Sequence, residues 1–252
     1  MRSYIKVAGS SVTGLAHQAK GLPCQDKFKV YRAKDRKSAG IALADGAGSS
    51  LFSQIGAESV TTCVIPYVKD NFNSLISNPE EAREKIVSYL LFRLGSLALK
   101  NKVHITELAC TLLFVYIERT KKAARFIAGH IGDGVIASSA KKEVTILSAP
   151  TRGEYANTTY FVTSEGVIPF CKIFTGLLQL PASFMIMSDG AAETLFVRKT
   201  TQINRAYYHQ MLGWCDRYPQ EKITAALRKN LEKGIFREVS GDDCSICLMK
   251  VT

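Results

Sequence analysis

Aspartates end several apolar, strand-like segments of this chain. Asp45 follows "IALA", Asp133 interrupts "GHIGDGVI", Asp189 follows "FMIMS" and Asp242 opens "DDCSICLMKV". Each lies beside a glycine or a second aspartate. A carboxylate at the end of an apolar strand loses hydration unless a partner compensates it. For any single aspartate, turn chemistry is a sufficient explanation, because Asp-Gly favours tight turns and aspartate can cap a helix.

The recurrence of this pattern favours a second interpretation, a shared cation site. Loops at strand ends bring distant segments together, and Mg²⁺ and Mn²⁺ prefer oxygen ligands drawn from such segments. Two such ions would activate a bridging water and stabilise the oxygens of a phosphoryl group in an in-line displacement. None of the four histidines stands in an H-E-x-x-H or comparable zinc spacing. The sequence therefore indicates a hard divalent cation.

The segments between these aspartates predict an α+β domain. Strands are expected in "YIKVAGSSV" and in a hairpin of "FKVYR" and "AGIALAD", followed by helical sequence in "SQIGAESVTTCVIPYVKDNF". A further helix is expected to begin at Asn78, which can cap it, with Pro79 in its first turn. The stretch from "LACTLLFVYIER" to "EVTILSA" resembles an antiparallel meander, and the strand "ASFMIM", two helices and "CSICLMKV" follow. Helices grouped between antiparallel strands predict one layered domain over residues 1–252.

Composition limits the classes of protein to consider. The chain has 46% hydrophobic residues, enough for a core, and no apolar run of about 18 residues that would predict a transmembrane helix. It lacks a secretory signal at its start, and its seven cysteines are scattered, so we expect reduced thiols and a cytoplasmic location. The thiols of "CSIC" are expected on opposite faces of a strand. The net charge of +11 is spread over several segments, which predicts a solvated basic surface and no nucleic-acid groove.

Six motifs resemble those of the PP2C (PPM) metal-dependent protein serine/threonine phosphatases, especially the compact bacterial type. In chain order they are "GLPCQDKFKV", "LADGAGSS", "ACTLLFVYI", "GHIGDGVI", "MSDGAAETL" and "GDDCSICLMKV". A lone Asp-Gly carries no information, but six motifs in the family's order are specific. The resemblance implies the PP2C α-β-β-α sandwich, two antiparallel sheets flanked by helices, with metal ions at one edge. It also implies hydrolysis of phosphoserine and phosphothreonine by metal-activated water, without a phosphoenzyme.

The resemblance further implies the main metal ligands. Asp45 is expected to bridge two Mn²⁺ or Mg²⁺ ions, with the Gly46 carbonyl as a neighbouring ligand. Asp189 matches the next ligand of the first ion. Asp242 matches the C-terminal ligand.

Other acidic positions have subsidiary roles in the same resemblance. Asp26 matches the N-terminal acidic motif that acts on metal-bound water, and Gln25 beside it replaces a common glutamate. Asp133 matches the aspartate that joins Asp189 at a weaker third metal ion in bacterial members. Glu193 has the spacing of another acidic residue near that third ion, and Asp243 is expected to face away.

Two residues depart from the family's pattern. The motif "DGHGG" of many relatives here reads "DGAGS", so Ala47 replaces the histidine proposed as general acid, and the leaving-group proton must come from elsewhere. Gly21 stands where the family has a phosphate-binding arginine, whose fork suits phosphate. His17 and Lys20 are the nearby candidates to replace it, although a structural role is equally consistent for His17.

The sequence thus predicts a metal-dependent protein serine/threonine phosphatase with phosphorylated proteins as substrates and a serine/threonine kinase as its counterpart. Neither nucleic acid nor membrane is expected as a partner. One alternative is a catalytically silent PP2C-like module that binds phosphoproteins; the missing histidine and arginine favour it, and the full set of aspartates opposes it. Another is a Mg²⁺ phosphohydrolase for small phosphoesters, but "ADGAG" lacks the D-x-D nucleophile of the haloacid dehalogenases.

Overall fold

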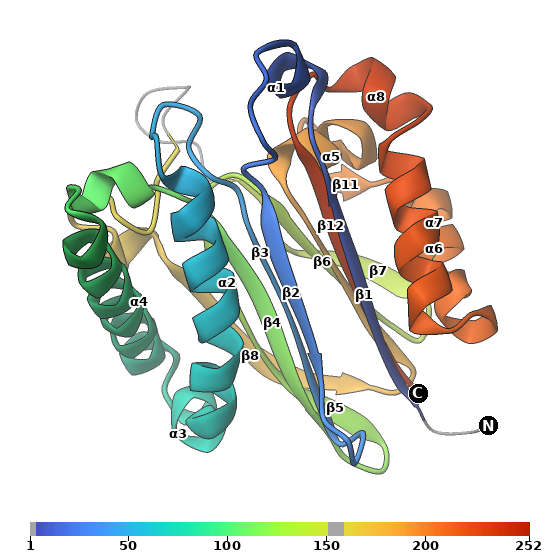
Figure 1. The fold of residues 1–252 in the computed structure, drawn as a ribbon. Coiled ribbons are helices and arrows are strands. Elements are labelled where there is room, and N and C mark those ends of the chain that lie inside the picture. Colours follow the sequence, from blue (N-terminus) through green and yellow to red (C-terminus); the bar gives the residue numbers. More distant parts are fainter. Residues whose placement is uncertain (1–3, 151–158) are drawn as a thin grey trace.

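The computed structural model describes residues 4–150 and 159–252, which form two packed antiparallel sheets with helices on both outer faces (Figure 1). The first sheet has the strand order β1-β12-β9-β6-β7, with the bounds Ile5–Val12, Cys244–Val251, Ala182–Met187, Val135–Ala140 and Glu143–Ser148. The second has the order β2-β3-β4-β5-β8, with the bounds Lys27–Arg32, Ser38–Ala44, Leu112–Arg119, Ala123–Ile131 and Lys172–Gln179. A short ribbon pairs β10 (Phe196–Val197) with β11 (Gln202–Ile203).

Helices cover the outer face of each sheet (Figure 1). The second sheet is covered by α2 (Ser53–Asp70), α3 (Phe72–Ser77) and α4 (Pro79–Asn101). The first is covered by α5 (Asp189–Leu195), α6 (Arg205–Arg217), α7 (Gln220–Leu231) and α8 (Ile235–Val239). The short α1 (Leu15–Ala19) and the 3₁₀ turns Ile105–Leu108 and Ile168–Phe170 lie in connections. The α-β-β-α sandwich expected from the sequence is confirmed.

Strand β9 shows how the sequence specifies these layers. Phe184 and Ile186 pack between the two sheets, while Met185 and Met187 pack under the helices of the first sheet. Both faces of the strand are buried, which is why its sequence is continuously apolar. The alternation in β12 confirms the expectation for its thiols, because Cys244 packs under the helices and Cys247 between the sheets.

The expected start of α4 is confirmed in detail. The Asn78 side-chain oxygen accepts a hydrogen bond from the Glu81 backbone N–H at 3.3 Å, and Pro79 occupies the first turn. Such a cap contributes about 1 kcal/mol to helix stability. Across the described residues, no helix is both long enough and apolar enough to cross a membrane.

The expected meander is wrong. Strands β4 and β5 pair with each other, and so do β6 and β7, but the chain changes sheets between β5 and β6. Gly132 lies at this crossing with a φ of +115°, and a Cβ there would come within 2.5 Å of the Thr111 side chain. A run of strand-like segments indicates which residues are buried but not which strands pair, so the pattern could not reveal the crossing. Strand β8, the edge partner of β5, was also not predicted.

Candidate metal centre

Loops at one end of the sandwich gather the aspartates predicted from the sequence. Asp45 follows β3 and Asp26 precedes β2, so the second sheet supplies both. Asp189 follows β9, Asp242 precedes β12, and Asp133 lies in the crossing before β6, at the same end of the first sheet. The site therefore exists only because the two sheets pack face to face.

Three of these carboxylates form a tight group. Asp45, Asp133 and Asp189 each present an oxygen, and these oxygens all lie within 4.8 Å of one another. Burial, followed by the negative charge of Asp133, raises the pKa of Asp189 to about 7. Burial, followed by the charges of Asp26 and Asp189, raises the pKa of Asp45 well above its usual value. Mutual repulsion at this spacing is relieved by a shared cation or by protons.

Asp26 lies beneath this group and is only 2% exposed. Neither of its carboxylate oxygens has a hydrogen-bond partner among the described residues. Burial raises its pKa to about 6. An unpartnered buried carboxylate is costly, and an all-oxygen donor set suits hard divalent ions. The residues present therefore fit Mg²⁺ or Mn²⁺.

Backbone contacts fix the position of Asp45. Its N–H donates to the Thr111 hydroxyl at 2.9 Å, and its carbonyl accepts from the Thr111 N–H at 2.8 Å. The next residue, Gly46, bridges to Cys110 in antiparallel fashion. A Cβ on Gly46 would lie 2.9 Å from the Ser53 backbone at the start of α2, so only glycine fits this turn without a shift. Asp133 is held separately, because its Oδ2 accepts from the Thr159 hydroxyl at 2.6 Å.

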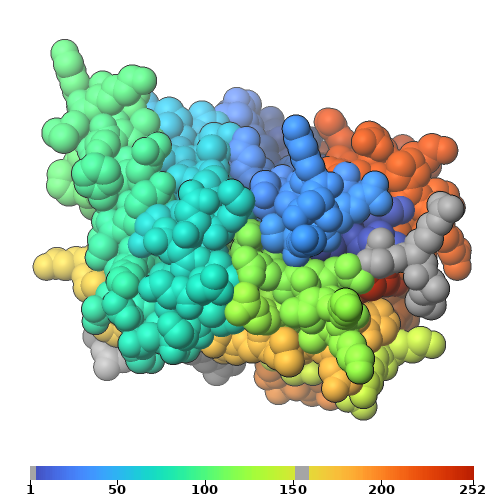
Figure 2. Space-filling model, turned by 90° about the horizontal axis from the view of Figure 1, so that it is seen from below, coloured from blue at the N-terminus to red at the C-terminus, as the bar shows by residue number. Residues whose placement is uncertain are grey.

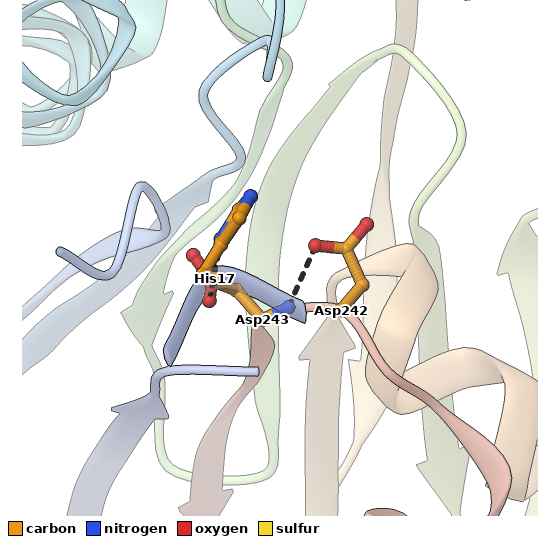
Figure 3. Close-up of side chains that lie close together, drawn as sticks. All are labelled: His17, Asp242 and Asp243. Atoms are coloured by element: carbon orange, nitrogen blue, oxygen red, sulfur yellow. Dashed lines mark hydrogen bonds and ion pairs between the residues drawn. The ribbon is translucent and has the colours of Figure 1, made fainter. Parts of the chain in front are cut away.

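The two neighbouring aspartates before β12 diverge (Figure 3). Asp243 is buried, and its two oxygens accept backbone hydrogen bonds from Gly14 at 2.7 Å and Gln25 at 2.6 Å. Asp242 is exposed and lines a small pocket of about 140 Å³. The other lining residues are His17, Gln25, Asp45, Gly46, Ala47, Gly48, Thr111, Asp133, Thr159 and Phe161. Asp243 therefore anchors the loop that presents Asp242.

His17 reaches this pocket from α1. Its Nδ1 lies 3.0 Å from Asp243 Oδ1, and Figure 3 shows the other ring nitrogen pointing away from Asp243. Lys20 is exposed at the end of α1 and does not line the pocket. Glu193 is exposed on α5 and is likewise absent from the lining. Of the two candidates that could replace the missing arginine, the structure brings only His17 to the site.

The structure agrees with the sequence on one further residue and adds two that the sequence analysis missed. His130, expected to be structural, is buried with its Nδ1 2.6 Å from the Ser148 hydroxyl, and burial lowers its pKa to about 3. Thr111 and Thr159 were not predicted as site residues. Thr111 lies within the quoted "ACTLLFVYI" motif, which could have drawn attention to it. Nothing in the local sequence marks Thr159.

A model of the protein phosphatase 2C family matches residues 13–232 of the chain. The chain belongs to the protein phosphatase 2C family. Serine/threonine-protein phosphatase 3 of Escherichia coli (strain K12) is 26% identical over 171 residues, which cover 66% of this chain and 66% of that protein. The chain thus spans a little under two thirds of this curated relative's length.

Solved structures share the fold of this protein phosphatase 2C member. The S. agalactiae serine/threonine phosphatase superposes with a TM-score of 0.64 at 15% identity, covering 99% of this chain and 100% of that one. The catalytic domain of the serine threonine protein phosphatase PstP, solved in complex with two manganese ions, gives a TM-score of 0.62 at 15% identity and covers 100% of both chains.

Proposed function

We propose that this protein is a metal-dependent protein serine/threonine phosphatase, formed as one domain over residues 1–252. The observation that carries the proposal is the group of half-buried, mutually repelling carboxylates contributed by both sheets, above a buried Asp26 whose two oxygens are unpartnered. The repulsion between these carboxylates is unfavourable when no cation is bound, and a bound divalent cation would relieve it. Family membership and the E. coli relative support the phosphatase chemistry.

The proposed metal ions are two Mn²⁺ or Mg²⁺, held by Asp45, the Gly46 carbonyl, Asp189 and Asp242. Asp133 would join Asp189 at a weaker third ion. When bound, these ions would supply an activated water and positive charge at the phosphoryl oxygens. Asp26, fixed behind the pocket, would accept a hydrogen bond from the attacking water and so orient it.

His17 is proposed to contact the substrate phosphate in place of the arginine that Gly21 lacks. The 3.0 Å contact between Nδ1 and Asp243 Oδ1 positions the ring so that Nε2 faces the pocket. When both nitrogens are protonated, Nε2 donates to the phosphate or to the leaving oxygen, a proton source that Ala47 does not provide. Lys20, exposed nearby, would add only long-range attraction for the phosphate.

The test is release of phosphate from a phosphothreonine peptide with Mn²⁺, with Mg²⁺ and with EDTA. We expect turnover that requires the metal and disappears in Asp189→Ala. Because a folding defect could mimic this loss, the far-ultraviolet circular dichroism of the variant is compared with that of the parent. A folded, metal-binding parent that releases no phosphate would contradict the proposal. It would favour the silent phosphoprotein-binding module, for which Ala47 and Gly21 are the only evidence in the sequence.

Phosphorylated proteins are the proposed substrates and a serine/threonine kinase the proposed counterpart, with neither nucleic acid nor membrane as a partner. A cytoplasmic location stays a prediction; the free state of all seven cysteines is consistent with it.

A further inference from the structure

The first sheet carries a second pocket, at the end of its strands opposite to the carboxylates. Strands β1, β12, β9 and β6 each have one end at the metal centre, beside Gly14, Asp242, Asp189 and Asp133 respectively. Their other ends line a pocket of about 1140 Å³, through Lys6, Lys250, Ala182 and Ser139. At about 3.4 Å per residue, the eight residues of β1 separate the two by roughly 25 Å. We call this second site the distal pocket.

The distal pocket lies between the sheet and α6, which contributes His209, Leu212, Gly213 and Asp216 to its lining. Tyr4, Arg36, Lys142, Pro181, Ser183 and Thr252 complete it. Figure 2 views the molecule from this end, where the blue turn between β2 and β3 and the green turn between β4 and β5 project beside the red C-terminal segment. Small-molecule pockets commonly have volumes of about 300–1,000 Å³. The distal pocket lies slightly above that range.

Charge in the distal pocket is strongly one-sided. Its lining includes four Lys or Arg side chains and one acidic side chain, Asp216. Asp216 forms an ion pair with Lys250 at 2.7 Å and accepts a hydrogen bond from the Tyr4 hydroxyl, so its carboxylate is already engaged. Among the described residues, Arg36 and Lys142 make no ion pair, and both are exposed. The pocket thus has cationic groups available for an anion.

The floor of the pocket is apolar. Ala182 and Leu212 are 2% and 3% exposed and belong to the well-packed interior, and Pro181 lies beside them. Two buried hydroxyls, Ser139 and Ser183, lie 2.6 Å apart, and Ser183 also lies 3.1 Å from the Tyr208 hydroxyl. Gly213 adds no side chain, and a Cβ built on it would have no atom within 4 Å. A ligand would therefore meet apolar surface inside and positive charge at the rim.

We propose that the distal pocket binds a small organic anion that combines an apolar ring or chain with a phosphate, sulfate or carboxylate group. The apolar body would lie over Ala182, Leu212 and Gly213, where it displaces water from apolar surface. The anionic group would lie between Arg36 and Lys142. No residue of this site belongs to the metal centre, so the proposal stands independently of the phosphatase activity.

The test uses two fluorescent probes on the full chain without metal. The probe 8-anilinonaphthalene-1-sulfonate carries the required anion and ring system, and N-phenyl-1-naphthylamine is its uncharged counterpart. We expect one sulfonate probe to bind per chain, more tightly than the uncharged probe. Absence of binding, or several equivalent sites, would overturn the proposal.

A substitution in the apolar floor tests whether the probes bind in the distal pocket. In Gly213→Leu, the new side chain would occupy the apolar floor and collide with a bound probe. Because such overpacking costs over about 1 kcal/mol, the affinity for both probes should fall by about tenfold or more. Gly95→Leu is the matched control, because Gly95 is also helical, in α4, with no atom within 4 Å of a built Cβ. Equal binding by the parent and Gly213→Leu would show that the probes bind elsewhere.

The charged rim is tested separately. The double variant Arg36→Gln with Lys142→Gln should weaken the sulfonate probe about fivefold and leave the uncharged probe unchanged, as expected for two partly exposed charges. The control is Lys100→Gln with Lys199→Gln, two exposed cations outside the pocket. An equal loss in this control would indicate binding by net charge alone. Because these substitutions are at the surface, they decide the proposal even if Gly213→Leu fails to fold.

Discussion

The two ends of the first sheet differ in charge and in how that charge is held. At one end, half-buried aspartates lie close together without a Lys or Arg ion pair among the described residues, and the pKa values of Asp45 and Asp189 rise. At the other, lysines and an arginine surround an apolar hollow, exposed or half-exposed to solvent. The same four strands carry both. Like charges held close together away from water lower the stability of the fold and so require a specific counter-ion. Solvated charges lower it little, even when no ligand is bound.

Removing a metal ligand should produce the largest difference between the two ends. Asp189→Ala should lower kcat/KM on a phosphothreonine peptide roughly a thousandfold, since metal charge stabilises the phosphoryl oxygens by several kcal/mol. The double variant Arg36→Gln with Lys142→Gln should retain kcat/KM within about twofold, because these exposed charges lie roughly 25 Å from the reaction. A comparable loss in both would show that the two ends act as one site.

The stability of the metal-free protein should depend on pH because of the acidic end. Burial raises the pKa of Asp26 to about 6 and that of Asp189 to about 7, from 3.8. A pKa raised in the folded state means that folding takes up protons, so this stability is complete below about pH 4 and is lost as pH rises to about 7. Urea unfolding in EDTA should therefore give a free energy of unfolding lower at pH 8 than at pH 5, by on the order of 3 kcal/mol.

Saturating Mn²⁺ should remove most of this pH dependence, because the bound ion keeps the carboxylates ionised. The double variant Asp26→Asn with Asp189→Asn, measured in EDTA, should lose much of the dependence, with the part due to Asp45 remaining, and be more stable than the parent at pH 8. A parent whose stability is flat between pH 5 and pH 8 without metal would mean that the carboxylates are not strained in the folded state.

A smaller effect is expected at His17. His17→Ala should lower kcat/KM about tenfold, within the range for loss of a charged hydrogen bond to phosphate. Asp243→Asn should produce part of this loss by releasing the ring, and the double variant should be no worse than the worse single variant. Binding of Mn²⁺, followed by calorimetry, should be unchanged in His17→Ala. Additive losses would show that Asp243 acts through the Asp242 loop and not through His17.

The sequence predicted the acidic end far better than the basic one. Asp45, Asp133, Asp189 and Asp242 each stand in a short motif at the boundary of a strand, and the order of these motifs along the chain carried the resemblance that assigned their roles. His17 was a candidate, but its Asp243 partner is 226 positions away and was expected to face elsewhere. Lys20 illustrates the limit, because closeness in sequence to the missing arginine placed it at the site and the turn of α1 directs it to solvent.

The distal pocket could not be predicted at all. Arg36, Lys142 and Lys250 come from separate turns and strands; neither Arg36 nor Lys142 is part of a motif, and nothing in the motif that contains Lys250 marks this lysine as a pocket residue. The change of sheet after β5 was missed for a related reason, since strand patterns show which residues are buried but not which strands pair. Both features depend on long-range packing.

Strand β12 has a consequence for the order in which the protein is made. It contains the last strand residues of the sequence yet lies in the middle of the first sheet, between β1 and β9, and Asp243 just before it binds Gly14 across 229 positions. Contacts of such sequence separation form slowly. During synthesis, β1 cannot pair with β12 until residues 244–251 have left the ribosome. A nascent chain therefore cannot complete the first sheet, or bring Asp242 to the other carboxylates, before this segment is free to fold.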